Sequence, residues 1–369
     1  MELAAPRVLD VAGQPDEALD TTPDTPAVFL ILAREGAPYL GRTSLLRRRL
    51  KRLLGARETP SRLLNLRGVA ERVEFWPTAS RLESSLVLYE LARRHYPDEH
   101  LKLLKLRMPP YLRVALSNRF PRTQVTTRIA GARALHYGPF RRRAAADLFE
   151  GQFLDLFQVR RCQEDLAPSP DHPGCIYGEM GMCLRPCQEV VGEQEYGSEV
   201  KRMVEFLQTG GRAMVETITR ARDRLSEELC FEDAEREHKR LERVTEVLRL
   251  KDELAADIDR LCGVAVTPST KENAVELWFV LRGGFLAPRR FGFEVAEGQP
   301  VSIDRRLREI AAALEAPKLS TERRQEELAL LGRWYYSSWR DGEWLGFEDL
   351  SGIPYRRLVN AIHRVATAS

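Results

Sequence analysis

The spacing of apolar and polar positions divides the first hundred residues into strands and amphipathic helices. Residues 27–32 are continuously apolar and residues 71–76 are apolar at alternate positions, so we expect a strand in each. Leucines recur at helical spacing over residues 44–54, and residues 79–95 repeat the helical pattern. Residues 1–25 are rich in Asp and Pro and poor in apolar side chains, which predicts a flexible acidic tail.

The second part of the chain has longer helical patterns and one hairpin. Residues 141–158 predict a helix, and residues 193–261 are almost wholly helical in pattern, with a break at 210–211. Residues 274–295 predict a β-hairpin whose turn uses the positive-φ glycine pair at 283–284. Two further helical stretches and an aromatic-rich end follow. The pattern predicts an α+β multidomain protein.

Composition limits the cellular setting. The chain has 369 residues, enough for two to four compact units. Its N-terminus lacks a basic stretch followed by an apolar core, so we expect no signal peptide. No apolar run reaches membrane-spanning length. We therefore expect a cytoplasmic protein, without a membrane partner, in which thiols stay reduced.

The charge is distributed unevenly along the chain. Residues 42–161 hold 26 Lys and Arg against 10 Asp and Glu, although the whole chain has a net charge of only +3. A segment this basic favours a nucleic-acid partner, because phosphate neutralisation releases counterions. A solvated basic surface balanced by the acidic remainder is the alternative.

Four of the six cysteines fall within 26 residues, with the spacing C-x12-C-x7-C-x3-C. They are Cys162, Cys175, Cys183 and Cys187. Four thiolates can hold a tetrahedral Zn²⁺ or an Fe–S cluster, and spacing alone does not choose between them. Disulfides or ordinary buried cysteines are the alternatives, and a reducing compartment disfavours the first.

The order of these features resembles the UvrC family, the incision subunits of bacterial nucleotide excision repair. The residues that carry the resemblance are Tyr39-Leu40-Gly41, the basic helix after it, Tyr137-Gly138-Pro139-Phe140, the cysteine quartet and a charged helical hairpin. The resemblance covers about residues 26–295. The RNase H-like half of UvrC has no counterpart in the residues that follow.

The first module resembles a GIY-YIG nuclease. The resemblance implies catalytic positions at Tyr39 and Arg49, where a guanidinium would stabilise charge on the phosphorane. It also implies that the basic residues around them contact DNA. These are Arg42, Arg47, Arg48, Lys51 and Arg52.

This module departs from the family pattern at two positions. Phe29 stands where the family has its first tyrosine, and Leu88, nine residues before Pro97, stands at the metal-binding glutamate. Leucine cannot ligate Mg²⁺, so the only metal carboxylate of the site is lost. Glu90 is two residues away, about 200° round the helix. We predict a degenerate nuclease site, with Mg²⁺ bound only if another carboxylate replaces the missing one.

The cysteine quartet and the hairpin carry the family's other properties. Because all four cysteine positions match, the resemblance implies a [4Fe–4S] cluster, with zinc as the alternative. Residues 228–241 resemble the UVR motif, through which UvrC and UvrB pair. The apolar anchors would be Leu229, Phe231, Ala234 and Leu241. A hairpin packed only on its own domain is the alternative.

These expectations combine into a domain plan. We predict an acidic tail, a small GIY-YIG-like α/β domain, a basic and Cys-rich cluster region, an α-helical region with the UVR hairpin, and a small C-terminal α/β appendage. The corresponding ranges are 1–25, 26–105, 106–192, 193–262 and 263–369.

The predicted function is a DNA-binding, UvrC-like repair protein that pairs with a UvrB-type partner. An active single-incision endonuclease and a redox-sensing interaction module are the alternatives. The sequence does not indicate an oligomeric state.

Overall fold

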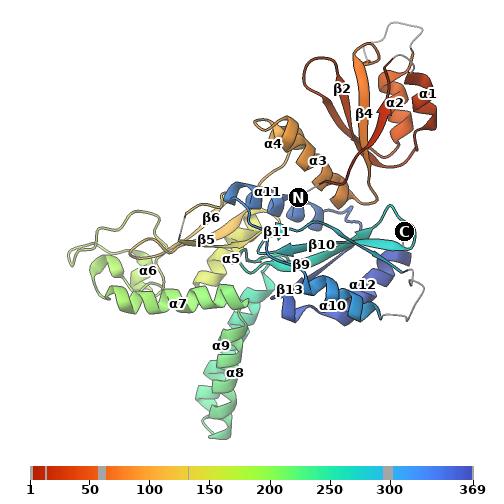
Figure 1. The fold of residues 1–369 in the computed structure, drawn as a ribbon. Helices are drawn as coiled ribbons and strands as arrows, with labels where there is room; N and C mark the ends of the chain where they lie inside the picture. The colour runs from red at the N-terminus through yellow and green to blue at the C-terminus, as the bar shows by residue number, and fades with distance from the viewer. Residues whose placement is uncertain (1–2, 13–14, 57–63, 132, 294–301, 368–369) are drawn as a thin grey trace. The chain divides into compact units, whose positions relative to one another are not determined.

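The computed structural model describes residues 3–12, 15–56, 64–131, 133–293 and 302–367. The chain forms two compact units, and each is assembled from separate stretches of sequence. Unit 1 comprises Met1–Arg107, Cys262–Pro317 and Arg333–Ser369, and unit 2 comprises Met108–Leu261 and Lys318–Gly332. Helices and several separate sheets make up both units (Figure 1). The mixed α and β composition predicted from the sequence is confirmed.

The N-terminal part of unit 1 is an antiparallel sheet with helices on both faces. Its strands, in the order β1-β4-β2-β3, are β1 (Arg7–Asp10), β2 (Ala27–Ala33), β3 (Tyr39–Thr43) and β4 (Ala70–Pro77). Its helices are α1 (Pro15–Thr21), α2 (Leu46–Leu54), α3 (Arg81–His95) and α4 (His100–Leu104). Phe29 and Ile31 of β2 pack with α1 and α2, whereas Val28 and Leu30 pack with α3. This division follows from the alternation of side chains along a strand.

The predicted flexible acidic tail is wrong for the described residues of 1–25. Strand β1 pairs antiparallel with β4, Arg7 lying opposite Phe75. Helix α1 follows, and its Leu19 is fully buried in the core of this sheet. The segment is ordered because its few apolar side chains complete a sheet edge and a helix-packed face.

The second sheet of unit 1 is formed by residues after 261. Its strands are β9 (Cys262–Pro268), β10 (Ala274–Leu281), β11 (Gly284–Phe285), β12 (Arg289–Gly292) and β13 (Glu343–Phe347). The order is β11-β10-β9-β13, and β12 also pairs with β10. Helices α10 (Ile303–Ala312) and α12 (Tyr355–Thr367) pack against it, and the 3-10 turn η2 (Leu350–Gly352) precedes α12.

The predicted hairpin within 274–295 is confirmed, but its turn lies one residue earlier than expected. Arg282 and Gly283 have φ values of 51° and 73°. Gly284 already belongs to β11. Two consecutive positive φ values match the right-handed twist of the flanking strands, as in the tightest hairpins.

Unit 2 holds a four-stranded sheet covered by helices. The strands, in the order β6-β5-β7-β8, are β5 (Tyr111–Ala115), β6 (Thr123–Thr126), β7 (Ala134–Gly138) and β8 (Ala256–Asp257). The other elements are α5 (Arg143–Leu154), α6 (Ile176–Glu179), the 3-10 turn η1 (Pro186–Gln188), α7 (Glu193–Thr209) and α11 (Thr321–Tyr335), whose last residues fall in unit 1. The rings of Tyr137, Phe149 and Phe153 stack in the core, and Phe206 packs against Phe153 with its ring tilted by 52°.

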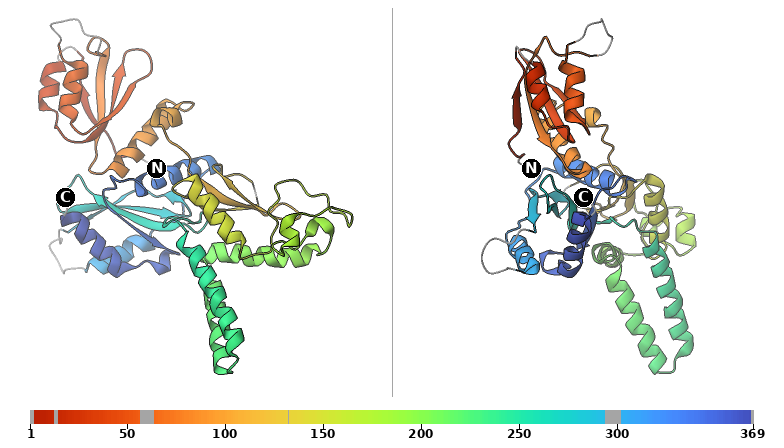
Figure 2. Two further views of the ribbon diagram at one scale, coloured as in Figure 1. Left: turned by 180° about the vertical axis from the view of Figure 1, so that it is seen from behind. Right: turned by 90° about the vertical axis from the view of Figure 1, so that its right-hand side faces the viewer.

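A long helical hairpin extends from the rest of unit 2. It consists of α8 (Arg212–Glu227) and α9 (Phe231–Arg249), and three views show it projecting away from the sheet of its own unit (Figures 1 and 2). The predicted break at 210–211 is confirmed: Gly210 and Gly211 have φ values of 60° and 82°. A Cβ on Gly211 would lie 2.6 Å from the Leu248 side chain, so the glycine also permits close packing. No described helix is long and apolar enough to cross a membrane.

Candidate functional sites

The structure brings the two predicted catalytic residues together. Tyr39 begins β3 and Arg49 lies in α2, and Nη2 of Arg49 donates a hydrogen bond to Oη of Tyr39 at 2.9 Å. The ring of Phe29 is fully buried, with its centroid 6.1 Å from that of Tyr39. A Cβ on Gly41 would lie 2.7 Å from Phe29, which explains why glycine follows Tyr39-Leu40.

Leu88 belongs to an apolar cluster rather than to a polar site. It packs with Val28, Leu30 and Leu40, which are on the α3 face of the sheet. Tyr39 lies opposite Ile31 of β2 and packs with the cluster on the α2 face. The side chains of Leu88 and Tyr39 therefore contact different faces of one sheet. In the part of the chain that is described, no three His, Cys, Asp or Glu side chains are arranged to hold a metal ion.

Basic residues of helix α2 form ion pairs with acidic residues of the N-terminal segment. Nζ of Lys51 lies 2.5 Å from Oδ1 of Asp20, and Nε of Arg48 lies 3.9 Å from Oδ2 of Asp24. Arg47 donates a hydrogen bond to the carbonyl of Thr22. These three predicted DNA contacts are engaged within unit 1. Arg42, at the end of β3, has no ion pair with a described residue and lines a cavity instead.

The four cysteines of the quartet occupy one loop-rich region between α5 and α7. All four are free thiols. Cys183 and Cys187 are buried, Cys162 is half-buried, and Cys175 is exposed. Tight turns hold this region: Arg185, between the two buried cysteines, has a φ of 54°, and its backbone N–H lies 3.4 Å from Sγ of Cys183. The carbonyl of Cys187 accepts a hydrogen bond from the N–H of Ser169 at 3.0 Å.

The donor set of the quartet fits a soft metal or an Fe–S cluster in chemistry. Burial, with a smaller contribution from the other three thiols, raises the pKa of the Cys183 thiol to about 11. Burial also raises the pKa of Cys162. A bound metal reverses this preference, because it binds the thiolate form. The described side chains do not form a preassembled ligand cage.

The four predicted anchors of the hairpin divide into two pairs. Leu229, in the turn between α8 and α9, and Phe231, the first residue of α9, are 72% and 64% exposed. Ala234 is buried, and Leu241 packs against the core of unit 2. Ion pairs such as Lys239 with Glu235, at 2.7 Å, run along the outside of α9. Of the four predicted anchors, only Leu229 and Phe231 therefore present apolar side chains to a partner.

A cavity of about 550 Å³ in unit 1 combines the predicted DNA contact Arg42 with residues that had no predicted role. Arg42, Arg81 and Arg333 line it together with Trp339 and Asp341. Arg81 begins α3, whereas Arg333 and Trp339 come from the last forty residues of the chain. Their separation in sequence exceeds 250 residues, so no local pattern indicates that they meet.

Comparison with known protein families gives a match in the middle of the chain. Residues 109–206 match the model of the UvrC/Cho excinuclease middle domain. This range includes β5, β6, β7, α5 and the whole cysteine quartet. No solved structure matches the chain.

Curated relatives extend the similarity toward both ends. The UvrABC system protein C of Lachnospira eligens is 23% identical over 291 residues, which are 78% of this chain and 47% of the relative. That of Moorella thermoacetica is 28% identical over 272 residues, 73% of this chain and 44% of the relative. The chain thus spans about half the length of the curated relatives it matches. Over most of its length the chain is similar to UvrC, and the resemblance identified from its sequence is confirmed.

Proposed function

We propose that this protein binds DNA in nucleotide excision repair, in the cytoplasm, with a degenerate GIY-YIG nuclease site. The observation that carries the proposal is that Leu88, which the family resemblance assigns to the position of the metal-binding glutamate, is an apolar residue in an apolar cluster. Phe29 adds to it, because a buried phenyl ring offers no hydroxyl. Without a carboxylate to hold a divalent ion, the site lacks the Lewis acid that polarises a phosphodiester.

An active single-incision endonuclease is the second candidate. It is favoured by the 2.9 Å hydrogen bond between Arg49 and Tyr39, which orients the two groups that remain of the family site. The guanidinium could stabilise developing phosphorane charge, but hydrolysis would still require a metal ligand or a base from elsewhere.

We propose a [4Fe–4S] cluster held by the quartet, with zinc as the alternative ion. The proposal is supported by four free thiols in one loop-rich region and by the match of this region to the UvrC/Cho middle domain. When bound, the cluster would cross-link loops that lack a continuous apolar core of their own. Its role here is structural: the ligands Cys162, Cys175, Cys183 and Cys187 would turn inward around it.

We propose that the turn of the α8–α9 hairpin binds a UvrB-type protein. Leu229 and Phe231 are the only two of the predicted anchors that are exposed, and an exposed aromatic residue at a helix turn suits a hot spot of binding. The ion pairs along α9 would form the polar rim and affect partner choice more than affinity.

The hairpin is tested by capture of purified UvrB on immobilised protein. Leu229→Ala combined with Phe231→Ala should weaken capture at least about tenfold, since each contributes on the order of 1 kcal/mol or more. Leu148→Ala is the matched control, because Leu148 is also an exposed leucine of unit 2. Capture that is unchanged by the double substitution would contradict the proposal. Both variants should keep the melting temperature, because the changed side chains are exposed.

A further inference from the structure

The cavity of unit 1 has an excess of positive charge. Three guanidinium groups, those of Arg42, Arg81 and Arg333, line it, and Asp341 is the one carboxylate among the described residues around it. Burial, then Arg333 and Arg81, lower the pKa of Arg42. Like charges thus face one another across the cavity, an arrangement that is unfavourable until an anion enters.

Asp341 offsets one of these positive charges, but among the described residues it forms no ion pair with the three guanidinium groups. Its Oδ2 accepts a hydrogen bond from the backbone N–H of Arg81 at 2.6 Å, and its Oδ1 accepts one from Nε1 of Trp334 at 3.1 Å. Both oxygens are therefore used to hold the start of α3 and the C-terminal segment. Arg81 lies over the ring of Trp339, 5.2 Å from its centroid. Arg333 donates one hydrogen bond, from Nη1 to the carbonyl of Leu104 at 2.9 Å.

Among the described residues, the guanidinium groups of Arg42 and Arg81 have no hydrogen-bond acceptor, and that of Arg81 contacts the Trp339 ring. Arg42 lies opposite Val28 in the pairing of β3 with β2, whereas Tyr39 lies opposite Ile31. Side chains alternate along a strand, so Arg42 is on the α3 face and Tyr39 on the α2 face. The cavity contains neither Tyr39 nor Arg49. It is thus separate from the predicted nuclease residues.

We propose that this cavity binds a phosphate monoester carried by a nucleotide. Three guanidinium groups against one engaged carboxylate match a dianionic phosphate, and the hydroxyls of Ser44, Thr78 and Ser84 line the same space. The volume exceeds that of a phosphate group and lies in the usual range for small-molecule sites. The half-buried Trp339 adds an aromatic surface for the base.

Two sources supply this chemistry: a free mononucleotide and the 5′-phosphorylated end of a DNA strand. The test uses the full chain with deoxyadenosine 5′-monophosphate, deoxyadenosine, and a fluorescent single-stranded 12-mer with or without a 5′-phosphate. Calorimetry and fluorescence anisotropy measure the affinities at one salt concentration. Arg42→Gln is the test variant. Arg305→Gln is its control, because Arg305 is an exposed arginine of the same unit, paired with Glu309 and outside the cavity.

We expect at least one phosphorylated ligand to bind about tenfold or more tightly than its unphosphorylated counterpart, and Arg42→Gln to abolish that difference. If the 5′-phosphate raises the affinity of the oligonucleotide alone, the ligand is a strand end. If it raises the affinity of the mononucleotide alone, the ligand is a free nucleotide. The inference is overturned if neither ligand shows phosphate dependence, or if Arg42→Gln behaves like Arg305→Gln. The mononucleotide arm needs neither duplex DNA nor UvrB, so its result is separate from that of the proposed function.

Discussion

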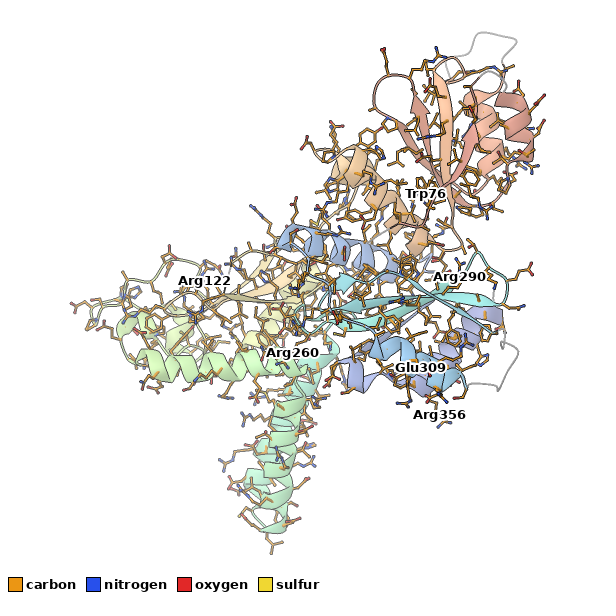
Figure 3. The ribbon with its side chains drawn as sticks, in the orientation of Figure 1. Trp76, Arg122, Arg260, Arg290, Glu309 and Arg356 are labelled. Atoms are coloured by element: carbon orange, nitrogen blue, oxygen red, sulfur yellow. The ribbon has the colours of Figure 1, made fainter. Side chains whose placement is uncertain are left out.

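Glu83 caps helix α3 while most of its side chain is removed from water. Ser80 accepts a hydrogen bond from the N–H of Glu83 at 3.0 Å, and Oε2 of Glu83 accepts one from the N–H of Ala79 at 2.8 Å. This reciprocal pair is a capping box. Burial, with a smaller contribution from the nearby Glu276, raises the pKa of Glu83 to about 7. Glu276 is itself paired with Arg290, labelled in Figure 3, at 2.6 Å.

The raised pKa predicts that unit 1 loses stability as the pH rises. Because the folded state holds the proton more tightly than the unfolded state, the contribution is full below about pH 4.5 and is lost as the pH rises through about 7. Between pH 5 and 8 the loss is on the order of 2–3 kcal/mol. Glu83→Gln keeps an oxygen for Ala79 and should remove most of this pH dependence.

The measurement is the free energy of unfolding from urea titrations at pH 5 and pH 8. Glu309→Gln is the control, since Glu309 is exposed and paired with Arg305 in the same unit. If wild type and Glu83→Gln lose the same stability between these pH values, Glu83 does not titrate in this window.

The positive charge of helix α2 is partly neutralised by carboxylates of the N-terminal segment. The sequence shows a row of basic residues, and the structure adds Asp20 and Asp24 as partners of Lys51 and Arg48. Both ion pairs are exposed, so each stabilises the fold by only about 0–1 kcal/mol. Their larger effect is on DNA, because they reduce the positive potential of the helix.

Asp20→Asn should therefore raise affinity for DNA about two- to fivefold at low salt, and less at high salt. Glu17→Gln is the matched control. It removes one negative charge from the same helix, and Glu17 forms no ion pair with a described residue. Fluorescence anisotropy with a labelled duplex measures both. Equal effects of the two variants would mean that general charge, rather than the pairing with Lys51, limits binding.

The proposed cluster would need all four cysteines as ligands. Anaerobically purified protein should contain about four iron atoms per chain and absorb visible light. Cys187→Ala should lose the iron, because Cys187 is a proposed ligand, whereas Cys230→Ala should keep it. Metal analysis and absorption spectra distinguish these results. Stoichiometric zinc without iron would identify the alternative ion, and iron retained in Cys187→Ala would exclude Cys187 as a ligand.

Elements with local signals could be predicted from the sequence. The leucine stripe of α2, the paired glycines before α8 and the hairpin turn near Gly283 depend on neighbouring residues only. Strand β1 could not be predicted, because its four residues are mostly exposed and their partner β4 begins sixty residues later. Such a strand is stabilised by its pairing and not by its own pattern.

At the scale of the whole molecule, two arrangements could not be predicted from the order of residues along the chain. Residues 318–332 belong to unit 2, although residues on both sides of them belong to unit 1. The cavity likewise combines Arg42 with Arg333, and only the fold shows that they are neighbours. Candidate residues within one motif, such as Tyr39 and Arg49, were brought together as the sequence indicated.

The proposed protein binds DNA but has lost the metal site of its nuclease. A nuclease assay tests both properties: the protein is incubated with nicked and lesion-bearing duplex DNA and Mg²⁺ or Mn²⁺, with and without UvrB. We expect DNA binding and no incision by wild type in any combination, at a salt concentration that allows the complex to form. Robust incision that Arg49→Ala abolishes would contradict this expectation and would establish the single-incision endonuclease instead.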